Sequence, residues 1–209
     1  MRIALINGSP KIHHSASCIL LEELKLRISE KIQVADAALH TSAVSEDVWQ
    51  TLKSAEVWVF AYPLYVDGIP GHLLSCLMQL EQMHRGREIR VYGIVNCGFY
   101  EGIQAEYALK LLQNWCAKNG FLYGGGIGVG GGGGFARMPK VQGGHGPRAP
   151  IENALQELAD RLLQQETQEN QYVSVAFPRF LYRMAAQMGW RQMIKANGGR
   201  AGDLSKKPE

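Results

Sequence analysis

Glycine and hydroxyl side chains cluster near the amino terminus, where a polar segment separates two apolar runs. The segment Asn7–Ser17, NGSPKIHHSAS, follows RIALI and precedes CILLEELKLRI. Gly8 would let the backbone approach a ligand closely, the serine hydroxyls can donate hydrogen bonds, and Lys11 adds positive charge. A helix beginning after this segment would add free N–H groups that attract an anion. The pattern predicts a cradle for a phosphate monoester, although the same residues also suit a plain helix cap.

Two further loops combine aromatic side chains with glycine directly after apolar runs. They are YPLYVDGIPG, from Tyr62 to Gly71, and NCGFYEG, from Asn96 to Gly102. Aromatic rings at such places can pack on a planar ligand, or they can simply close the end of a strand. Asp67 could contact a ligand or cap a helix that begins near Pro70. We interpret Cys97 as a small packed residue, because nothing nearby in sequence would lower its thiol pKa.

The elements that position these loops follow from the hydrophobic pattern. Short apolar runs predict buried strands, and apolar residues at helical spacing predict helices between them. We expect strands within residues 2–7, 31–39, 56–63, 87–98 and 121–129, and helices within 15–28, 45–55, 70–83, 105–120, 151–165 and 179–196. Ser15 or Ser17 would cap the first helix, and Ser45 the second. Gly120 would end the fourth.

Strands that alternate with helices predict an α/β fold with a parallel sheet covered on both faces. Five such units suit a flavodoxin-like three-layer sandwich with strand order 2-1-3-4-5, followed by a C-terminal helical extension. In that order, ligands bind beyond the carboxyl ends of the strands, beside the switch between strands 1 and 3. The three polar loops would therefore meet at the place where this fold binds ligands.

The three loops together resemble the NADPH-dependent FMN reductase family, in order and spacing, over roughly residues 1–130. The resemblance implies FMN, with the phosphate held by Ser9, Lys11, Ser15, Ala16 and Ser17. The ribityl chain and ring would be lined by Pro63, Leu64, Tyr65, Val66 and Asp67. Backbone groups would meet the polar edge of the ring at Asn96, Cys97, Gly98, Phe99 and Tyr100. The turn KIHHSA departs from the more polar, Asn-containing turn that is common in the family, and we interpret His13 and His14 as exposed turn residues.

The resemblance implies an FMN-dependent NAD(P)H oxidoreductase. NADPH or NADH would reduce the flavin, and a small acceptor (a quinone, a nitro or azo compound, or free flavin) would take the electrons. No side chain need act as a catalytic acid or base. The alternative is a flavodoxin-like electron carrier that serves protein partners, although such carriers tend to be acidic and this chain has a pI near 8.7. A flavin-free regulatory domain would have little reason to keep all three loops.

A glycine-rich stretch, residues 124–134, invites a second interpretation. It matches the GxGxxG pattern, but nine glycines within eleven positions produce such matches automatically, and no helix is expected afterwards. We therefore reject a dinucleotide fingerprint. The stretch suits a flexible linker or, more specifically, a mobile loop at the end of the fifth strand that admits nicotinamide or substrate.

The C-terminal region is basic, with a net charge of +5 over residues 178–209 against −2 for the rest. We divide the chain into an FMN-binding domain, residues 1–170, and a helical extension, residues 171–209. An apolar stripe on the last helix, with Arg183 and Arg191 outward, would pack on the domain or on a partner subunit. Membrane contact is a weaker alternative.

Composition narrows the remaining possibilities. We expect a homodimer acting on a small-molecule acceptor, with no nucleic acid, because a total charge of +3 is small. Scattered cysteines exclude the usual zinc and iron–sulfur spacings and, like the missing signal peptide, favour a reduced, cytoplasmic protein.

Overall fold

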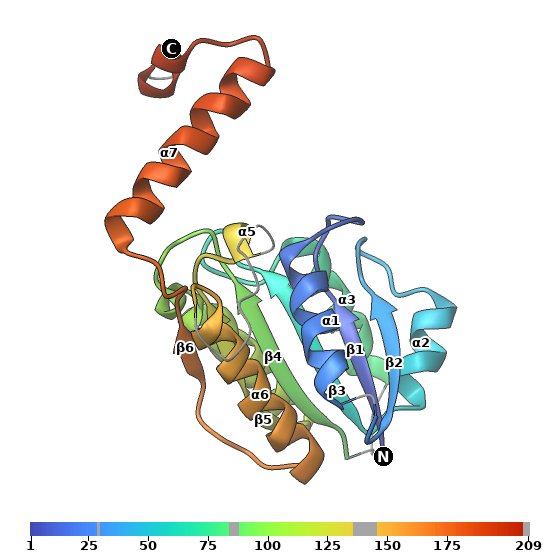
Figure 1. The fold of residues 1–209 in the computed structure, drawn as a ribbon. Coiled ribbons are helices and arrows are strands. Elements are labelled where there is room, and N and C mark those ends of the chain that lie inside the picture. Colours follow the sequence, from blue (N-terminus) through green and yellow to red (C-terminus); the bar gives the residue numbers. More distant parts are fainter. Residues whose placement is uncertain (29, 84–87, 136–145, 207–209) are drawn as a thin grey trace. The chain divides into compact units, whose positions relative to one another are not determined.

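The computed structural model describes residues 1–206 except 29, 84–87 and 136–145, and it contains one parallel sheet (Figure 1). The strands are β1 (Arg2–Asn7), β2 (Gln33–Ala38), β3 (Val57–Pro63), β4 (Arg90–Asn96), β5 (Leu122–Val129) and β6 (Gln171–Val173). The helices are α1 (Ala16–Ile28), α2 (Glu46–Lys53), α3 (Gly71–Met83), α4 (Glu106–Asn119), α5 (Gly132–Phe135), α6 (Ala149–Gln164) and α7 (Arg179–Ala196). Two 3-10 turns, Gly102–Ala105 and Ala201–Ser205, complete the set.

The strand order is β2-β1-β3-β4-β5-β6, and every pair is parallel. The flavodoxin-like order is confirmed, but the expected number of five strands was wrong. The sixth strand adds Gln171–Val173 to the β5 edge, where Tyr172 pairs with Gly128. Residues 171–173 therefore belong to the sheet and not to the extension in which the sequence placed them.

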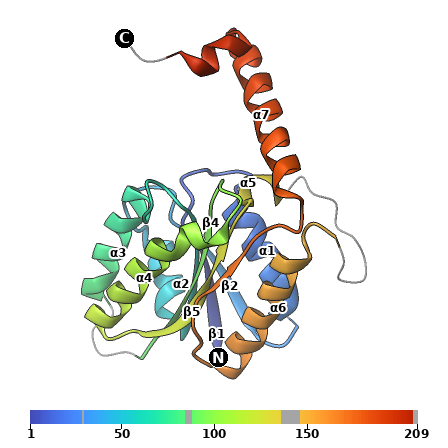
Figure 2. The ribbon, with the colours of Figure 1, turned by 90° about the vertical axis from the view of Figure 1, so that its left-hand side faces the viewer.

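Helices cover both faces of the sheet (Figure 2): α1 and α6 lie on one face, and α2, α3 and α4 on the other. Strand β3 shows how the sequence fills both layers. Trp58, Phe60 and Tyr62 belong to the core with α2, α3 and α4. The alternating Val57 and Val59 are also buried, as expected for a strand covered on both faces. The polar groups of two of these aromatic side chains are hydrogen-bonded. Trp58 Nε1 donates to the Leu52 carbonyl at 3.2 Å, and the Tyr62 hydroxyl donates to the Ala108 carbonyl at 3.0 Å.

Local signals begin and end the helices as the sequence predicts. Ser15 precedes α1, and its hydroxyl oxygen accepts from Cys18 N at 3.1 Å, so Ser15 is the cap of the first helix. Ser45 has extended backbone before α2 and accepts from Val48 N. Gly120 ends α4 in the left-handed region, at φ 74°.

The chain divides into two compact units, residues 1–175 and 176–209. The second unit consists of α7 and the 3-10 turn after it. Within this unit the side chains of α7 are not buried, and Phe180, Met184 and Met188 are more than half exposed. Arg183 and Arg191 line the same helix face as these three residues, so the expected separation of apolar and basic sides was wrong there.

Among the described residues, no helix has the length and apolar character needed to cross a membrane.

Candidate functional site

The first loop contains three buried serines whose oxygen atoms all accept hydrogen bonds. Ser9, Ser15 and Ser17 are at most 5% exposed. Ser9 Oγ accepts from Lys11 N (3.2 Å), Ser15 Oγ from Cys18 N (3.1 Å) and Ser17 Oγ from the Asn96 amide (2.8 Å). A hydroxyl has one hydrogen to donate, and none of these three hydrogens has an acceptor among the described residues. The loop is therefore arranged as a set of donors, which is the arrangement that an anion needs.

The start of α1 and the turn before it extend this set of donors. The first N–H groups of a helix have no acceptor within the helix, and those of Ala16 and Ser17 have none elsewhere in the described structure. Lys11 is exposed, and its Nζ lies 3.5 Å from the His14 carbonyl oxygen. His13 and His14 are exposed as predicted, with His14 at φ 50°. The helix-cap interpretation and the phosphate interpretation of this loop are thus compatible, because Ser15 caps α1 through its oxygen and keeps its hydrogen.

Gly8 allows a close approach within the protein itself. A Cβ at this position would lie 2.6 Å from Leu73 Cδ2 of α3, so glycine lets the loop pass beneath that helix. Gly8 N also donates to the Ala61 carbonyl of β3 at 2.8 Å. These contacts fix the start of the loop against the sheet.

Two asparagines at strand ends support the first loop, a role that was not predicted from the sequence. Asn7, the last residue of β1, accepts from Ser9 N at 3.1 Å. Asn96, the last residue of β4, donates to the Ser17 oxygen and to the Tyr62 carbonyl at 3.1 Å. Asn96 is buried, and because its side chain donates to Ser17 it supports the first loop. The signal that could have identified both residues is a buried amide at the carboxyl end of an otherwise apolar strand.

The second loop is a tight hairpin that exposes its aromatic side chain. Tyr65 and Gly68 exchange backbone hydrogen bonds, and Val66 and Asp67 between them have φ values of 49° and 55°. The Tyr65 side chain is 50% exposed, and Val66 is fully exposed. Pro63 and Leu64 are half-buried, and Leu64 N donates to the Asn96 carbonyl at 2.8 Å, which joins this loop to the third.

Asp67 does not cap α3, so one of the two roles considered for it is wrong. Its carboxylate has no hydrogen-bond partner in the described part of the chain, and Leu74 N in the first turn of α3 bonds to the Pro70 carbonyl instead. Asp67 is exposed.

The third loop leaves the sheet beside the glycine-rich stretch. Phe99 is 55% exposed, Tyr100 is half-buried, and a Cβ on Gly98 would meet no atom of the described residues within 4 Å. Cys97 is buried, and burial raises the pKa of its thiol, only partly offset by the Phe99 backbone. Cys97 is therefore a packed thiol, as the sequence predicts.

The glycine-rich stretch forms most of β5, a tightly packed turn and the start of α5, which corrects the expectation of a linker or mobile loop. Gly124–Gly128 lie within β5. Gly131 N donates to the Phe99 carbonyl (2.6 Å) and Gly132 N to that of Cys97 (2.9 Å). A Cβ on Gly130 would lie 2.1 Å from the backbone carbonyl oxygen of Tyr100. These glycines are required by close packing against the third loop; residues 136–145 of the same region lie outside the described residues.

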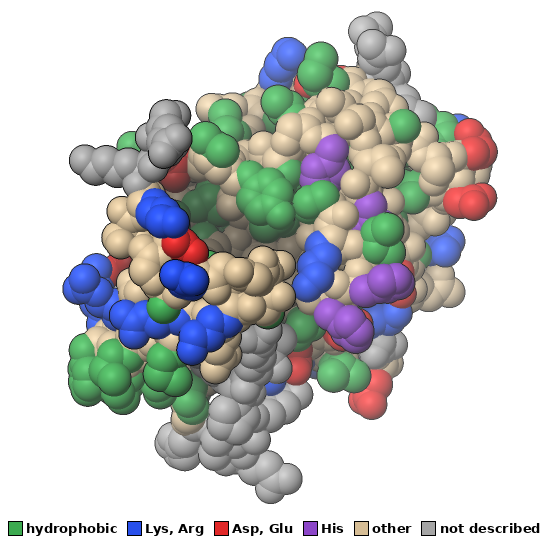
Figure 3. All heavy atoms as spheres, turned by 90° about the horizontal axis from the view of Figure 1, so that it is seen from above, with side chains coloured by type: hydrophobic (Ala, Val, Ile, Leu, Met, Phe, Trp, Pro, Cys, Tyr) green, Lys and Arg blue, Asp and Glu red, His purple; other side chains and the backbone are tan. Residues whose placement is uncertain are grey.

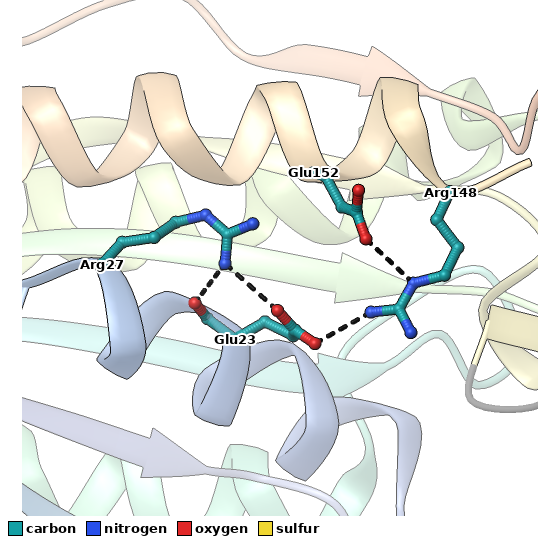
Figure 4. A network of polar contacts seen from close by, with 4 residues as sticks. All are labelled: Glu23, Arg27, Arg148 and Glu152. Atoms are coloured by element: carbon teal, nitrogen blue, oxygen red, sulfur yellow. Dashed lines mark hydrogen bonds and ion pairs between the residues drawn. The ribbon is translucent and has the colours of Figure 1, made fainter. Parts of the chain in front are cut away.

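A buried ionic network joins α1, which carries the first loop, to α6 (Figure 4). Arg148 Nη2 donates to Glu23 at 2.9 Å, and its Nε forms an ion pair with Glu152 at 3.2 Å. Arg27 also contacts Glu23, at 3.2 Å, and the Arg148 guanidinium lies over the Phe135 ring, 4.1 Å from its centroid. Arg148 is 8% exposed. The network therefore joins α1 to its neighbour α6 on the same face of the sheet.

Histidine side chains gather on the face to which the strands point (Figure 3). His13 and His14 belong to the first loop, and His40 follows β2 beside it. The structure thus brings all three predicted loops to one edge of the sheet, and it adds Asn7, His40 and the side chain of Asn96 to them.

Comparisons with known proteins support the fold. No family model matches the sequence, and no curated protein matches it. An NADPH-quinone reductase from P. pentosaceus is 14% identical with a TM-score of 0.54, over 78% of this chain and 97% of that one. An NAD(P)H:quinone oxidoreductase from Methanothermobacter marburgensis is 15% identical with a TM-score of 0.52, over 78% and 96%. A short-chain flavodoxin associated with a PDU bacterial microcompartment is 14% identical with a TM-score of 0.53, over 80% and 100%. The resemblance seen in the sequence is confirmed at the level of the fold: this chain has the flavodoxin-like fold.

Proposed function

We propose that the chain binds FMN at the carboxyl edge of its sheet and acts as an NAD(P)H-dependent oxidoreductase. One observation carries the proposal: the three buried serines of the first loop accept hydrogen bonds through their oxygens, so their hydrogens remain for an anion. A phosphate dianion offers several strong acceptor oxygens to these donors and to the start of α1. Lys11, on the exposed side of the loop, adds positive charge.

The other two loops offer surfaces that suit a planar ring. Tyr65 and Phe99 expose about half of their side chains at this edge, and stacking on a ring would remove that apolar surface from water. Gly98 carries no side chain, so the backbone of the third loop can approach the ring edge closely there. Bound FMN supplies hydride chemistry, accepting hydride from NADPH or NADH and reducing a quinone, a nitro or azo compound, or free flavin. The residues named here hold and orient, and none is assigned a catalytic proton transfer.

The cofactor is FMN and not FAD in this proposal, because the first loop is a cradle for a terminal monoester. The sequence has no second nucleotide-binding fingerprint for an adenylate. The experiment is to purify the protein, record its visible spectrum and chromatograph the released cofactor. FMN supports the proposal. FAD, or failure to reconstitute with FMN, overturns it.

Turnover tests the reductase half of the proposal. Anaerobic NADPH or NADH should bleach the flavin absorbance, and a panel of quinone, nitro and azo acceptors should restore it. The alternative is an electron carrier, which the similarity to a short-chain flavodoxin favours. A carrier would remain oxidised with either nicotinamide until a partner reductase is added. The basic pI near 8.7 favours the enzyme over a carrier of the acidic kind.

A homodimer completes the proposal. The helices α3 and α4 lie side by side, joined by an ion pair between Glu81 and Lys118 at 3.4 Å. Their outer surfaces carry exposed apolar side chains: Leu74, Met78, Tyr107 and Leu111. Apolar side chains gathered on neighbouring helices are typical of an interface. Sedimentation at equilibrium should give twice the chain mass, and a monomer at micromolar concentration would contradict the dimer.

A further inference from the structure

His40 is the residue from outside the first loop that fixes the direction in which this loop leaves Ser9. The two atoms Nδ1 of His40 and O of Ser9 are 2.6 Å apart, and the residues are 31 positions apart in sequence. A carbonyl oxygen can only accept, so the hydrogen of this bond lies on Nδ1. The ring is half-buried.

The Ser9 carbonyl belongs to the peptide bond with Pro10, which has no N–H group. This carbonyl is the one polar group through which that peptide can be held. Its orientation sets the backbone torsion at Ser9, and therefore the path of the chain towards Ser15. The other polar atoms of Ser9 are engaged locally, the nitrogen by Asn7 and the hydroxyl oxygen by Lys11 N. His40 supplies the contact that joins this peptide to a different strand.

His40 is itself held firmly. Leu39 N, directly before it, donates to the Asn7 carbonyl at 2.8 Å and extends the pairing of β2 with β1. The residues directly after it are bound by α3, because Cys76 Sγ contacts the Thr41 carbonyl (3.1 Å) and Gln79 Nε2 the Ser42 carbonyl (2.7 Å). The imidazole is thus presented from a backbone fixed on both sides, which is what a positioning residue needs.

We infer that His40 is a positioning residue for the phosphate site: through the Ser9 carbonyl it holds the first loop in the shape that aims its hydroxyl hydrogens at one anion. The inference rests on the proposed function, because it concerns the FMN phosphate. It assigns His40 no contact with the flavin ring and no part in proton transfer.

The test compares His40→Asn with His40→Leu. An Asn side chain can place its amide nitrogen where Nδ1 lies and keep the donor, whereas Leu fills similar space without one. Each apoprotein is titrated with FMN and with riboflavin, which has the ring but no phosphate, and binding is followed by flavin fluorescence. We expect His40→Leu to raise the FMN Kd tenfold or more and to leave the riboflavin Kd unchanged. His40→Asn should stay within about threefold of the wild type for both ligands.

Circular dichroism melting of each variant separates positioning from general stability. If His40→Leu does not fold, His40→Gln replaces it, because a Gln amide reaches the position of Nε2 and not that of Nδ1. An unchanged FMN Kd in the variant without the donor overturns the inference, and so does an equal loss of FMN and riboflavin. If the wild type binds neither ligand, the proposed function fails, and the inference falls with it. If the wild type binds FMN normally and only the His40 comparison fails, the proposed function stands.

Discussion

The side-chain amide of Asn96 donates a hydrogen bond of 2.8 Å to the hydroxyl oxygen of Ser17, across 79 positions of sequence. The bond connects the end of β4 to the start of α1, and it decides which way the Ser17 hydrogen points. An amide NH₂ can only donate, so the serine oxygen accepts and its own hydrogen stays available for a different acceptor. A side chain at the end of β4 thus makes Ser17, in the loop after β1, an acceptor in this bond and leaves its hydrogen free to be donated elsewhere.

Asn96→Asp would reverse the direction of the hydrogen bond between residues 96 and 17. A carboxylate cannot donate to Ser17, so it would draw the serine hydrogen to itself, and it would add negative charge beneath the phosphate. We expect the FMN Kd to rise tenfold or more, about 1.4 kcal/mol, in a fluorescence titration. Asn119→Asp is the control, because Asn119 bonds to the Trp115 carbonyl at the far end of α4. Equal FMN affinities in the two variants would remove Asn96 from the site.

Ser17→Asp places a negative charge at the start of α1, where it would face the phosphate. The helix dipole and the Asn96 amide favour an acid there and offset part of the cost of burying its charge. We therefore expect the loss of unfolding free energy to be smaller than the loss of FMN affinity, which should be at least tenfold, or about 1.4 kcal/mol. Calorimetric titration measures the affinity, and a thermal melt measures the stability. Ser45→Asp makes the same change at the start of α2 and should leave the FMN Kd as it is. An unchanged Kd for Ser17→Asp would place the phosphate elsewhere.

Arg148→Met breaks the ionic network between α1 and α6. Glu23 and Glu152 would lose their buried partner, and breaking a buried pair from one side typically costs about 3–5 kcal/mol of unfolding free energy. Urea denaturation measures this loss. The control is Lys110→Met, which removes an exposed ion pair with Glu106 and should change stability little. Similar urea midpoints for both variants would mean that the network contributes no more than a surface pair.

Gly130→Ala tests whether the glycine-rich stretch is packed and not mobile. The new methyl group would lie 2.1 Å from the backbone carbonyl oxygen of Tyr100, so the third loop would have to move. We expect a loss of about 1–3 kcal/mol in unfolding free energy, as for an overpacked core, together with weaker FMN binding. Gly98→Ala adds the same methyl group where no described residue lies within 4 Å, so it serves as the control for stability alone and should leave the unfolding free energy unchanged. A Gly130→Ala protein as stable as Gly98→Ala would restore the mobile-loop interpretation.

Deleting residues 176–209 tests the proposal that the extension packs on the domain or on a partner subunit. The apolar side chains of α7, among them Phe180, Met184 and Met188, are exposed within their own unit. If they cover another surface in solution, the truncated protein should melt at a lower temperature or sediment as a smaller species. An unchanged melting temperature and mass would contradict packing. Salt-sensitive binding of the full chain to anionic vesicles would then favour the membrane alternative.

Local patterns predicted the fold well, because each element carries its own signal. The local signals include the continuous apolar run of β3, the caps at Ser15 and Ser45 and the stop at Gly120, and each of them acts within a few residues. The sixth strand has no such signal: QYV is three residues long, and it becomes a strand because β5 offers a free edge. Composition alone wrongly predicted a flexible segment at residues 124–134. Its glycines are required because neighbouring backbone lies too close for a side chain.

The candidate site was predictable as three loops, but their connections were not. Strand order brings the loops together, and strand order can be inferred from the alternation of strands and helices. The support of Ser17 by Asn96 and of Ser9 by His40 depends on side-chain directions at strand ends that are distant in sequence. No spacing rule in a single sequence reveals such pairs.

The bond between Glu23 and Arg148 also has a consequence for protein synthesis. The two residues are 125 positions apart, so the helix that carries the first loop has left the ribosome long before its buried partner is made. Until Arg148 emerges, Glu23 has no cation from α6, and the face of α1 that packs on α6 stays open to water and to chaperones. The packing of α1 against α6 is therefore completed only after most of the chain has been translated.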